Sequence, residues 1–336
     1  EGEPRRIHSG AEIMDPVSHA LVGAAIGSLA RSSDPATVQA AYWSSVAGGV
    51  IPDADIVVRY IGGEMAYLAY HRSWTHSLPG ILGLPAAAAL ALKWAFPTVP
   101  WWVMFLWALA GALSHVFLDI TNAYGTMALL PWSRRKLALD ITMLVDLPLV
   151  GLIVAAILWT RTHPQQRVGA FATALLLFLA YLGLRYVLHA RLVRAAWARF
   201  AGEKPTAISI MPGLVGLLTW YLLVETPERY LVGTVRVPGD HWHISRAFER
   251  RGEDEVVTAA RQHPAARTFL AFARHPYAET RRDGNAIYVT WGDLRFLFRD
   301  RPVFTLTVVL DGSHRPLTAR LGRGFRRPEQ AGGARA

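Results

Sequence analysis

The sequence predicts an α-helical, polytopic membrane domain of about four to six spans, followed by a small soluble domain that contains β-strands. Hydrophobic residues make up 52% of the 336-residue chain and charged residues only 18%, whereas an ordinary soluble protein has about 25% charged residues. Apolar segments recur up to about residue 225, and β-branched and aromatic residues dominate beyond it. We expect a membrane domain over residues 14–204. An α+β or β-rich soluble domain with a basic tail is expected over residues 205–336.

Six apolar segments make up the membrane domain. Four of them approach the roughly twenty residues that cross a hydrocarbon layer of ~30 Å: 76–96, 100–121, 141–160 and 168–188. Segments 17–30 and 36–50 are shorter and rich in Ala, Gly and Ser, a composition that suits close helix packing within a bilayer. Consecutive segments of this length disfavour the alternative of a soluble bundle of buried helices.

The C-terminal part of the chain has the pattern of a β-domain. Segments 230–237, 286–298 and 303–310 are rich in β-branched and aromatic residues. Asp283-Gly284 and Asp311-Gly312 supply turn signals beside them. We therefore predict strands in all three segments.

The net charge of +10 has two interpretations, an acidic polymer as partner or the positive-inside bias of a membrane protein. If the helices run antiparallel, two basic stretches share one membrane face, namely the loop with Arg134, Arg135 and Lys136 and the stretch with Arg191, Arg194, Arg199 and Lys204. The opposite connections offer only Lys93, Arg161 and Arg167. This bias places the richer face and the C-terminal domain in the cytoplasm, and it needs no nucleic-acid partner.

The chain has no cysteine and twelve histidines. Disulfides, thiolate nucleophiles and Cys-ligated metal sites are therefore excluded. Any metal must be held by His, Asp and Glu.

Ionisable side chains at the ends of the apolar segments are costly to bury and usually functional. Starts of odd helices and ends of even helices share one membrane face when the helices run antiparallel. This parity predicts that all of these side chains lie on one side of the membrane: Asp15, His19, Asp53, Asp55, His71, His76, His115, Asp119, Asp140 and Asp146. Seven of them form the candidate metal site: His19, Asp53, Asp55, His71, His76, His115 and Asp119.

The spacing of these residues predicts a metal site. His115 and Asp119 are four residues apart and share one helical face, as do Asp15 and His19. Pro52 keeps the turn that carries Asp53 out of a regular helix. Imidazoles and carboxylates without thiolates suit one to three ions of Zn²⁺ or a similar divalent metal. With an open position, such a site activates water as a nucleophile.

Several polar residues also have a structural interpretation. A histidine at a helix end is often interfacial, and Asp15 and Asp34 precede prolines and fit turns or caps. Asp140 and Asp146 fit a cap of the fifth helix as well as they fit a site. Arg72 either orients a phosphate or faces lipid headgroups.

Several blocks resemble the YdjM-like family of LexA-regulated bacterial inner-membrane proteins, which are described as metal-dependent hydrolases. The matching blocks are Met14-Asp-Pro-Val-Ser-His-Ala-Leu-Val-Gly23, Pro52-Asp-Ala-Asp55, His71-Arg-Ser-Trp-Thr-His-Ser-Leu78, His115-Val-Phe-Leu-Asp119, Tyr124-Gly-Thr126, Pro131-Trp-Ser133 and Ala138-Leu-Asp140 through Asp146. The match is strong over residues 14–150, although Ser73 stands where glycine is common in the family.

That family is distantly similar to the zinc-dependent phospholipase C and P1 nuclease group, whose clustered zinc ions cleave phosphate esters. The resemblance implies that His115 and Asp119 form a ligand pair, with His19, His71 and His76 as further ligands. It also implies that Asp53 or Asp55 is a ligand or the general base.

The expected function is an integral, multi-pass hydrolase of the bacterial inner membrane that cleaves a phosphoester in a lipid or lipid-linked substrate. Its candidate catalytic residues are Asp55, Asp53 and Arg72. Two alternatives remain open. A transporter or ion-binding protein would use the same cluster as a binding site or proton relay, but transporter sites usually lie at mid-membrane between repeats. A membrane scaffold would hold a structural metal with every position filled by protein.

Overall fold

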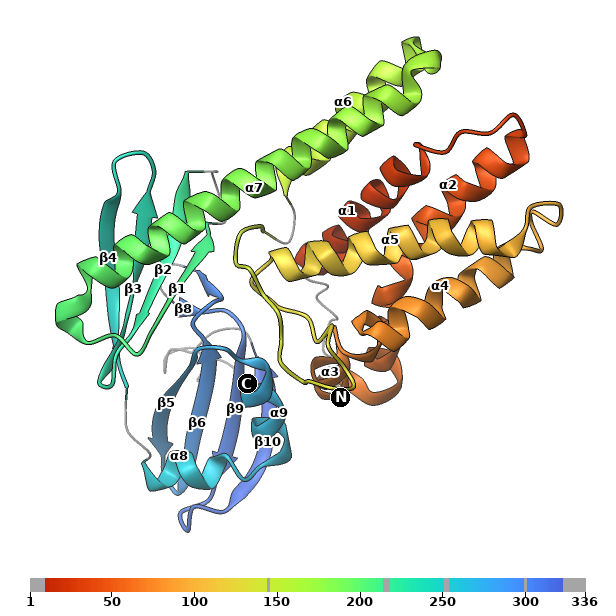
Figure 1. Cartoon of the computed structure of the whole chain (residues 1–336). Coiled ribbons are helices and arrows are strands. Elements are labelled where there is room, and N and C mark those ends of the chain that lie inside the picture. The colour runs from red at the N-terminus through yellow and green to blue at the C-terminus, as the bar shows by residue number, and fades with distance from the viewer. Residues whose placement is uncertain (1–9, 144–145, 214–217, 251–253, 299–300, 323–336) are drawn as a thin grey trace, which may run out of the picture. The chain divides into compact units, whose positions relative to one another are not determined.

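The computed structural model describes residues 10–143, 146–213, 218–250, 254–298 and 301–322, with residues 10–15 described by backbone alone (Figure 1). The chain divides into two compact units. The first comprises Glu1–Val57 and Tyr70–Arg191, and the second comprises Val58–Ala69 and Leu192–Ala336. The excursion between Val57 and Tyr70 therefore belongs to the second unit although it interrupts the first.

Helices build the first unit, with short 3₁₀ turns between some of them. The helices are α1 (Gly10–Gly27), α2 (Pro35–Val50), α4 (Leu78–Leu92), α5 (Trp101–Thr121), α6 (Leu147–Thr162) and α7 (Arg167–Arg199), the last of which continues into the second unit. Three 3₁₀ turns belong here, η1 (Ile51–Ile56), η2 (Trp74–His76) and η3 (Pro164–Gln166). Asp34 caps α2 by accepting hydrogen bonds from the amides of Ala36 and Thr37, as its position before proline predicts.

Small residues let α1, α2 and α5 approach closely, which brings their functional side chains together. A Cβ on Gly48 would overlap the carbonyl of Ala108, and one on Gly111 would overlap the carbonyl of Ser45. A Cβ on Gly49 would lie 2.7 Å from the carbonyl oxygen of His19. The Ala- and Gly-rich character of the first two apolar segments therefore serves helix contact, as expected.

Two helices in the described part of the chain are long and apolar enough to cross a membrane, Trp101–Thr121 and Pro164–Arg199. Three shorter apolar helices accompany them, Pro16–Gly27, Leu78–Leu92 and Leu147–Thr162. The expectation of four to six full-length spans is therefore not confirmed. Segment 76–96 is shortened because η2 precedes α4. Segment 141–160 is shortened because Asp146 caps a helix that begins only at Leu147.

The second unit contains two four-stranded antiparallel sheets (Figure 1). The first is a meander of β1 (Ala207–Pro212), β2 (Thr219–Glu225), β3 (Arg229–Arg236) and β4 (His241–Glu249). The second has the order β10-β9-β6-β5, with β5 (Pro276–Asp283), β6 (Ala286–Asp293), β9 (Thr305–Leu310) and β10 (Pro316–Gly322). A short ribbon pairs β7 (Leu297–Phe298) with β8 (Arg301–Pro302), and η4 (Ala201–Glu203) precedes β1. Three of these strands, β3, β6 and β9, coincide with the predicted β-segments.

Helices pack against the second sheet. α8 (Glu255–Ala260) and α9 (Pro264–Phe272) bury Val257 and Phe269 against Val289 and Val308. The excursion helix α3 (Val57–Tyr70) adds Met65 and Leu68 to the same apolar cluster. The chain on either side of α3 belongs to the first unit.

Candidate metal centre

Five stretches of the first unit bring their polar side chains to one place. His19 comes from α1, Asp53 and Asp55 from η1, His71 from the turn after α3, His76 from η2, and His115 and Asp119 from the last turns of α5. Their contacts link all seven residues into one network. The expected convergence of these seven side chains is therefore confirmed, and the membrane face on which they lie stays a prediction.

Four atoms at the middle of this network have the spacing of metal ligands. His76 Nε2 lies 3.1 Å from His115 Nε2 and 3.1 Å from Asp119 Oδ2. His115 Nε2 lies 3.5 Å from Asp119 Oδ2. Asp53 Oδ1 lies 3.5 Å from each of the two Nε2 atoms. A tetrahedral zinc ion with bonds of about 2.0–2.1 Å separates its ligand atoms by about 3.3–3.4 Å. Five edges of the tetrahedron therefore lie close to the ideal length.

Burial makes this cluster costly without a cation at its centre. The side chains of His76, His115 and Asp119 are fully buried, and only Asp53 is partly exposed, at 16%. Neither oxygen of Asp119 accepts a hydrogen bond of normal geometry from a described residue. Buried carboxylates without such partners are rare unless they are paired or bind a metal. Asp119 Oδ1 is paired with Arg72, and Oδ2 faces the Nε2 atoms of His76 and His115. The donor set around Oδ2 fits a divalent ion.

Hydrogen bonds turn the histidine rings so that their Nε2 atoms face the centre. His115 Nδ1 lies 2.7 Å from the carbonyl oxygen of Gly49 at the end of α2. A carbonyl only accepts, so Nδ1 of His115 carries a proton, and Nε2 is the nitrogen that the neutral ring can offer to a metal. His76 Nδ1 lies 2.9 Å from the hydroxyl oxygen of Thr75. Such contacts fix the orientation and basicity of metal-ligating histidines.

Asp55 organises the turn that carries His71. Its Oδ2 accepts the backbone N–H of Arg72 at 2.9 Å and lies 3.4 Å from the hydroxyl of Thr75. Both of its oxygens lie 3.2 Å from His71 Nδ1. Arg72 adopts a φ of 57°, a left-handed conformation that is unfavourable for a side chain of this size and is found at over-determined functional sites. Asp55 therefore helps to hold a strained backbone in place.

The guanidinium of Arg72 lies inside the centre. It donates to Asn122 Oδ1 at 3.1 Å, and its Nη2 lies 3.0 Å from Asp119 Oδ1. Arg72 is only 2% exposed, so the interpretation that it faces lipid headgroups is wrong. Its charge instead offsets that of Asp119.

The electrostatics of Asp53 favour the carboxylate form. Burial raises the pKa of Asp53, but hydrogen bonding and charge from His115 and His76 outweigh this and hold its pKa well below the usual range. The anion that a metal requires is therefore present at neutral pH.

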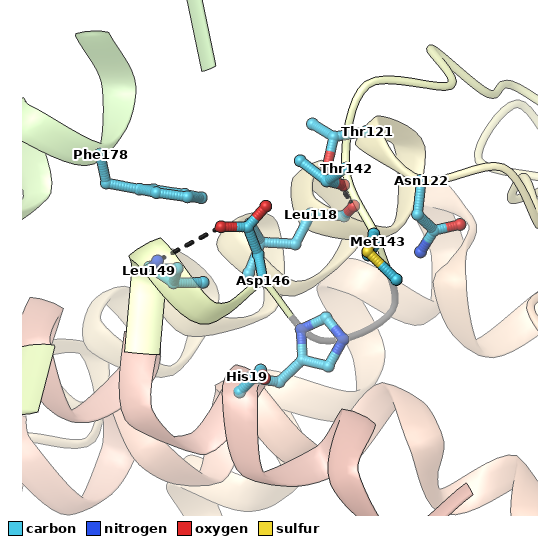
Figure 2. A pocket seen from close by; sticks show the side chains of 10 residues that line it. His19, Leu118, Thr121, Asn122, Thr142, Met143, Asp146, Leu149 and Phe178 are labelled. Atoms are coloured by element: carbon cyan, nitrogen blue, oxygen red, sulfur yellow. Dashed lines mark hydrogen bonds between the residues drawn. The ribbon is translucent and has the colours of Figure 1, made fainter. Parts of the chain in front are cut away.

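A small pocket adjoins the centre at His19 (Figure 2). Its volume is about 20 Å³, which is room for about one water-sized group. Asp146 faces this pocket and caps α6, accepting from the amide of Leu149 at 3.3 Å and the hydroxyl of Tyr181 at 3.2 Å (Figure 2). The interpretation of Asp146 as a helix cap is therefore confirmed, and Asp146 belongs to none of the three His/Asp groups that can hold an ion.

Some of the predicted polar residues lie outside the His/Asp groups, and some residues of the centre were not predicted from the sequence. Asp140 is buried before α6 but belongs to none of the three His/Asp groups that can hold an ion, and the side chain of Asp15 lies outside the described residues. Neither the carbonyl of Gly49 nor Asn122 could be identified from the sequence, because backbone acceptors and single amides carry no pattern. Thr75 lies within the His71–Leu78 block, so its contact with His76 could have been predicted from the sequence.

Comparisons with known proteins also divide the chain into an N-terminal and a C-terminal part. A family model described as YdjM inner membrane protein matches residues 14–192, which include the whole metal centre. Another, described as the YfhP C-terminal alpha/beta plait domain, matches residues 255–330, the part that contains α8, α9 and the second sheet. No solved structure matches the chain significantly.

The chain also resembles one curated protein along most of its length. It is 29% identical over 270 residues to the uncharacterized protein YfhP of Bacillus subtilis (strain 168), covering 77% of this chain and 80% of that protein. The YdjM match extends over more than half of the 336 residues. The chain therefore belongs to the YdjM inner membrane protein family.

Proposed function

We propose that this protein is an integral membrane hydrolase that depends on a divalent metal held by His76, His115 and Asp119, with Asp53 at the solvent side. The observation that carries the proposal is the spacing of the ligand atoms of His76, His115 and Asp119, which lie 3.1–3.5 Å apart, with Asp53 Oδ1 3.5 Å from both histidine nitrogens. Nitrogen and oxygen donors without sulfur favour zinc or a similar ion. Such an ion lowers the pKa of a bound water and polarises a phosphoryl oxygen.

The surrounding residues then take distinct roles. Asp53 is the partly exposed member of the central four, so we propose that it holds the metal on the side that water can reach. Asp55 Oδ2 is engaged by donors of the turn after α3, so Asp53 rather than Asp55 is assigned to this metal. Arg72 positions Asp119 and neutralises its charge.

The substrate class follows from where the centre lies. His115 and Asp119 occupy the buried face of α5, and exposed Leu113 and Phe117 occupy the opposite face of the same turns. An amphiphile can therefore keep its chain against the apolar helix surface while its polar group approaches the metal. A phosphoester in a lipid or lipid-linked molecule has this form.

Metal analysis and an activity screen test this function together. We expect stoichiometric zinc in the protein purified in detergent, and release of phosphate or of a phosphorylated headgroup from phospholipid or lipid-phosphate vesicles. His115→Ala and His76→Ala should each lose the metal and at least about 100-fold in activity. His163→Ala is the matched control, because this half-buried histidine stacks on Trp159 outside the centre. Full metal occupancy in a His76→Ala/His115→Ala/Asp119→Ala triple variant contradicts the proposal.

The proposal includes a multi-pass topology with the centre and the C-terminal domain on the cytoplasmic side, as the positive-inside bias indicates. The absence of cysteine makes this simple to test, since an introduced cysteine is the only thiol. In intact cells, a membrane-impermeant maleimide should label Ser32→Cys and spare Ser313→Cys until the cells are opened. The reverse labelling would invert the topology.

One observation favours a second candidate function. Four protein atoms at the centre leave no open position, which is typical of a structural metal site. A scaffold of this kind would keep its metal yet show no hydrolysis. Cobalt substitution separates the two, because inorganic phosphate should change the cobalt absorption spectrum only if an open coordination position exists.

A further inference from the structure

We propose that the centre holds two ions of different accessibility, with Asp53 shared between them. This inference rests on the proposed metal-dependent function and deepens it. Three groups of His and Asp side chains have ligand atoms within 4.8 Å of one another: His19/His115/Asp119, Asp53/His76/His115 and Asp53/Asp55/His71. Because the first two groups share His115, they cannot both hold an ion at the same time.

The first two groups compete for one atom. His115 donates its Nδ1–H to Gly49, so it has a single nitrogen, Nε2, to offer. That nitrogen lies within the central tetrahedron. A separate ion at the His19 side is further disfavoured because Arg72 already places its cation 3.0 Å from Asp119 Oδ1. We name the ion of the central tetrahedron the inner ion.

The third group, Asp53/Asp55/His71, does not include His115 and therefore does not compete for its nitrogen. Its link to the inner ion is Asp53, a carboxylate with two oxygens, and the inner ion uses only Oδ1. Carboxylates commonly bind two metals, one through each oxygen. Asp53 can therefore serve the inner ion and a second one, which we name the outer ion.

His71 and Asp55 supply the remaining ligands of the outer ion. His71 Nδ1 lies 3.2 Å from Asp55 Oδ1, close to the separation of about 3.3–3.4 Å between two ligands of one zinc ion. The donors from Arg72 and Thr75 both reach Asp55 Oδ2, so Oδ1 is the oxygen that these donors leave for a metal, and His71 Nδ1 lies 3.2 Å from both oxygens. The same hydrogen bonds that hold the turn thus set the outer ligands in place.

The side chains that hold the inner and the outer ion differ in how exposed they are. The inner His and Asp119 side chains are fully buried, whereas His71 is 19% exposed and Asp53 16% exposed. Four protein atoms surround the inner ion and three surround the outer one. The inner ion is therefore the tightly held one, and the outer ion has open positions that a substrate phosphate and water can reach.

Metal stoichiometry and electron paramagnetic resonance of the full-length protein in detergent test this inference. At saturating Zn²⁺ we expect two equivalents per chain, and with Mn²⁺ the spectrum of an exchange-coupled pair, since ions that share a carboxylate lie about 3.5–4 Å apart. His71→Ala should bind one equivalent and lose the coupling. His71→Gln should do the same with less change in volume, and His163→Ala should retain two coupled ions. Size-exclusion chromatography and circular dichroism check that each variant is folded.

The outcomes are distinguishable. One equivalent in both the wild type and His71→Ala, with no coupling in either, overturns the two-ion inference and makes His71–Asp55 a plain hydrogen-bonded pair. No bound metal in the wild type overturns the proposed function itself. Two uncoupled ions in the wild type would remove Asp53 as the shared ligand and so also overturn the inference.

Discussion

His115 Nδ1 lies 2.7 Å from the carbonyl oxygen of Gly49, so the end of one helix sets the orientation of a metal ligand on another. The carbonyl belongs to α2, and the ring belongs to α5. Gly49 occupies this position because α1 passes close to it, with the carbonyl oxygen of His19 only 2.7 Å from where a Cβ would stand. Helix packing and ligand geometry are therefore coupled at one residue.

The substitution Gly49→Ala should weaken metal binding without removing any ligand. The added methyl group must push α1 away or displace the carbonyl, which turns His115 from its position. Loss of such an orienting contact typically costs about 10–100-fold in metal affinity. Competition with a chromophoric chelator measures this. Gly151→Ala is the control, since a Cβ there meets nothing within 4 Å, and an unchanged affinity in Gly49→Ala would contradict the coupling.

Thr75 provides a second test of ligand orientation. Thr75→Val removes the hydroxyl that lies 2.9 Å from His76 Nδ1 while keeping the shape of the side chain. We expect metal affinity to fall by about 10-fold or more. Thr75→Ser restores the hydroxyl and should restore the affinity. If valine and serine behave alike in the same chelator competition, the hydroxyl does not orient His76.

The convergence of the seven side chains could be predicted from the sequence, but their individual roles could not. Helix parity alone predicts that His19, His115 and Asp119 lie together, because it depends only on the order and direction of segments. The partners of these side chains are backbone atoms, such as the carbonyl of Gly49, which look the same in every sequence. Asp53 and Asp55 were equivalent in the sequence and differ in the structure, because only Asp55 meets the donors of the turn that carries Arg72.

The lengths of the helices were less predictable, for a local reason. Asp146 begins α6 five residues into an apolar segment that hydropathy treats as continuous. The excursion helix α3 escaped prediction because its apolar residues are split between packed and exposed positions. Met65 and Leu68 pack on the second sheet, while Ile61 is exposed.

That excursion predicts a dependence of the metal centre on the second unit. The chain leaves Asp55 for α3 and returns at His71, so packing of Leu68 helps to fix the returning turn. Leu68→Asp places a charge against apolar neighbours and should weaken metal binding by about 10-fold, as loss of an outer support does. Ile61→Asp, at a position that is 84% exposed on the same helix, is the control. Equal metal affinity in the two variants would show that α3 does not support the centre.

The second unit has its own buried charge pair, Asp293 and Arg295, whose stability contribution should depend on pH. Both side chains are fully buried, and Arg295 Nη2 lies 2.6 Å from Asp293 Oδ2. Burial raises the pKa of Asp293, but the charge and hydrogen bonds of Arg295 outweigh it, so the pKa lies below its usual value. A lowered folded-state pKa means that the contribution is fully present above the unfolded pKa of about 3.9 and is lost as the pH falls through the folded value.

Removing the charge of Asp293 should be far more harmful than removing one on the surface. Asp293→Asn leaves the buried guanidinium of Arg295 without its anion, which typically costs about 3–5 kcal/mol. Asp283→Asn breaks the exposed contact with Arg281 and should cost less than about 1 kcal/mol. Urea unfolding followed by tryptophan fluorescence reports on this unit through the buried Trp291 and Trp220. Because the asparagine variant has already lost the ion pair, its difference from the wild type should shrink below about pH 3.9, and a difference that stays constant down to pH 2 would mean that the pair contributes through packing rather than charge.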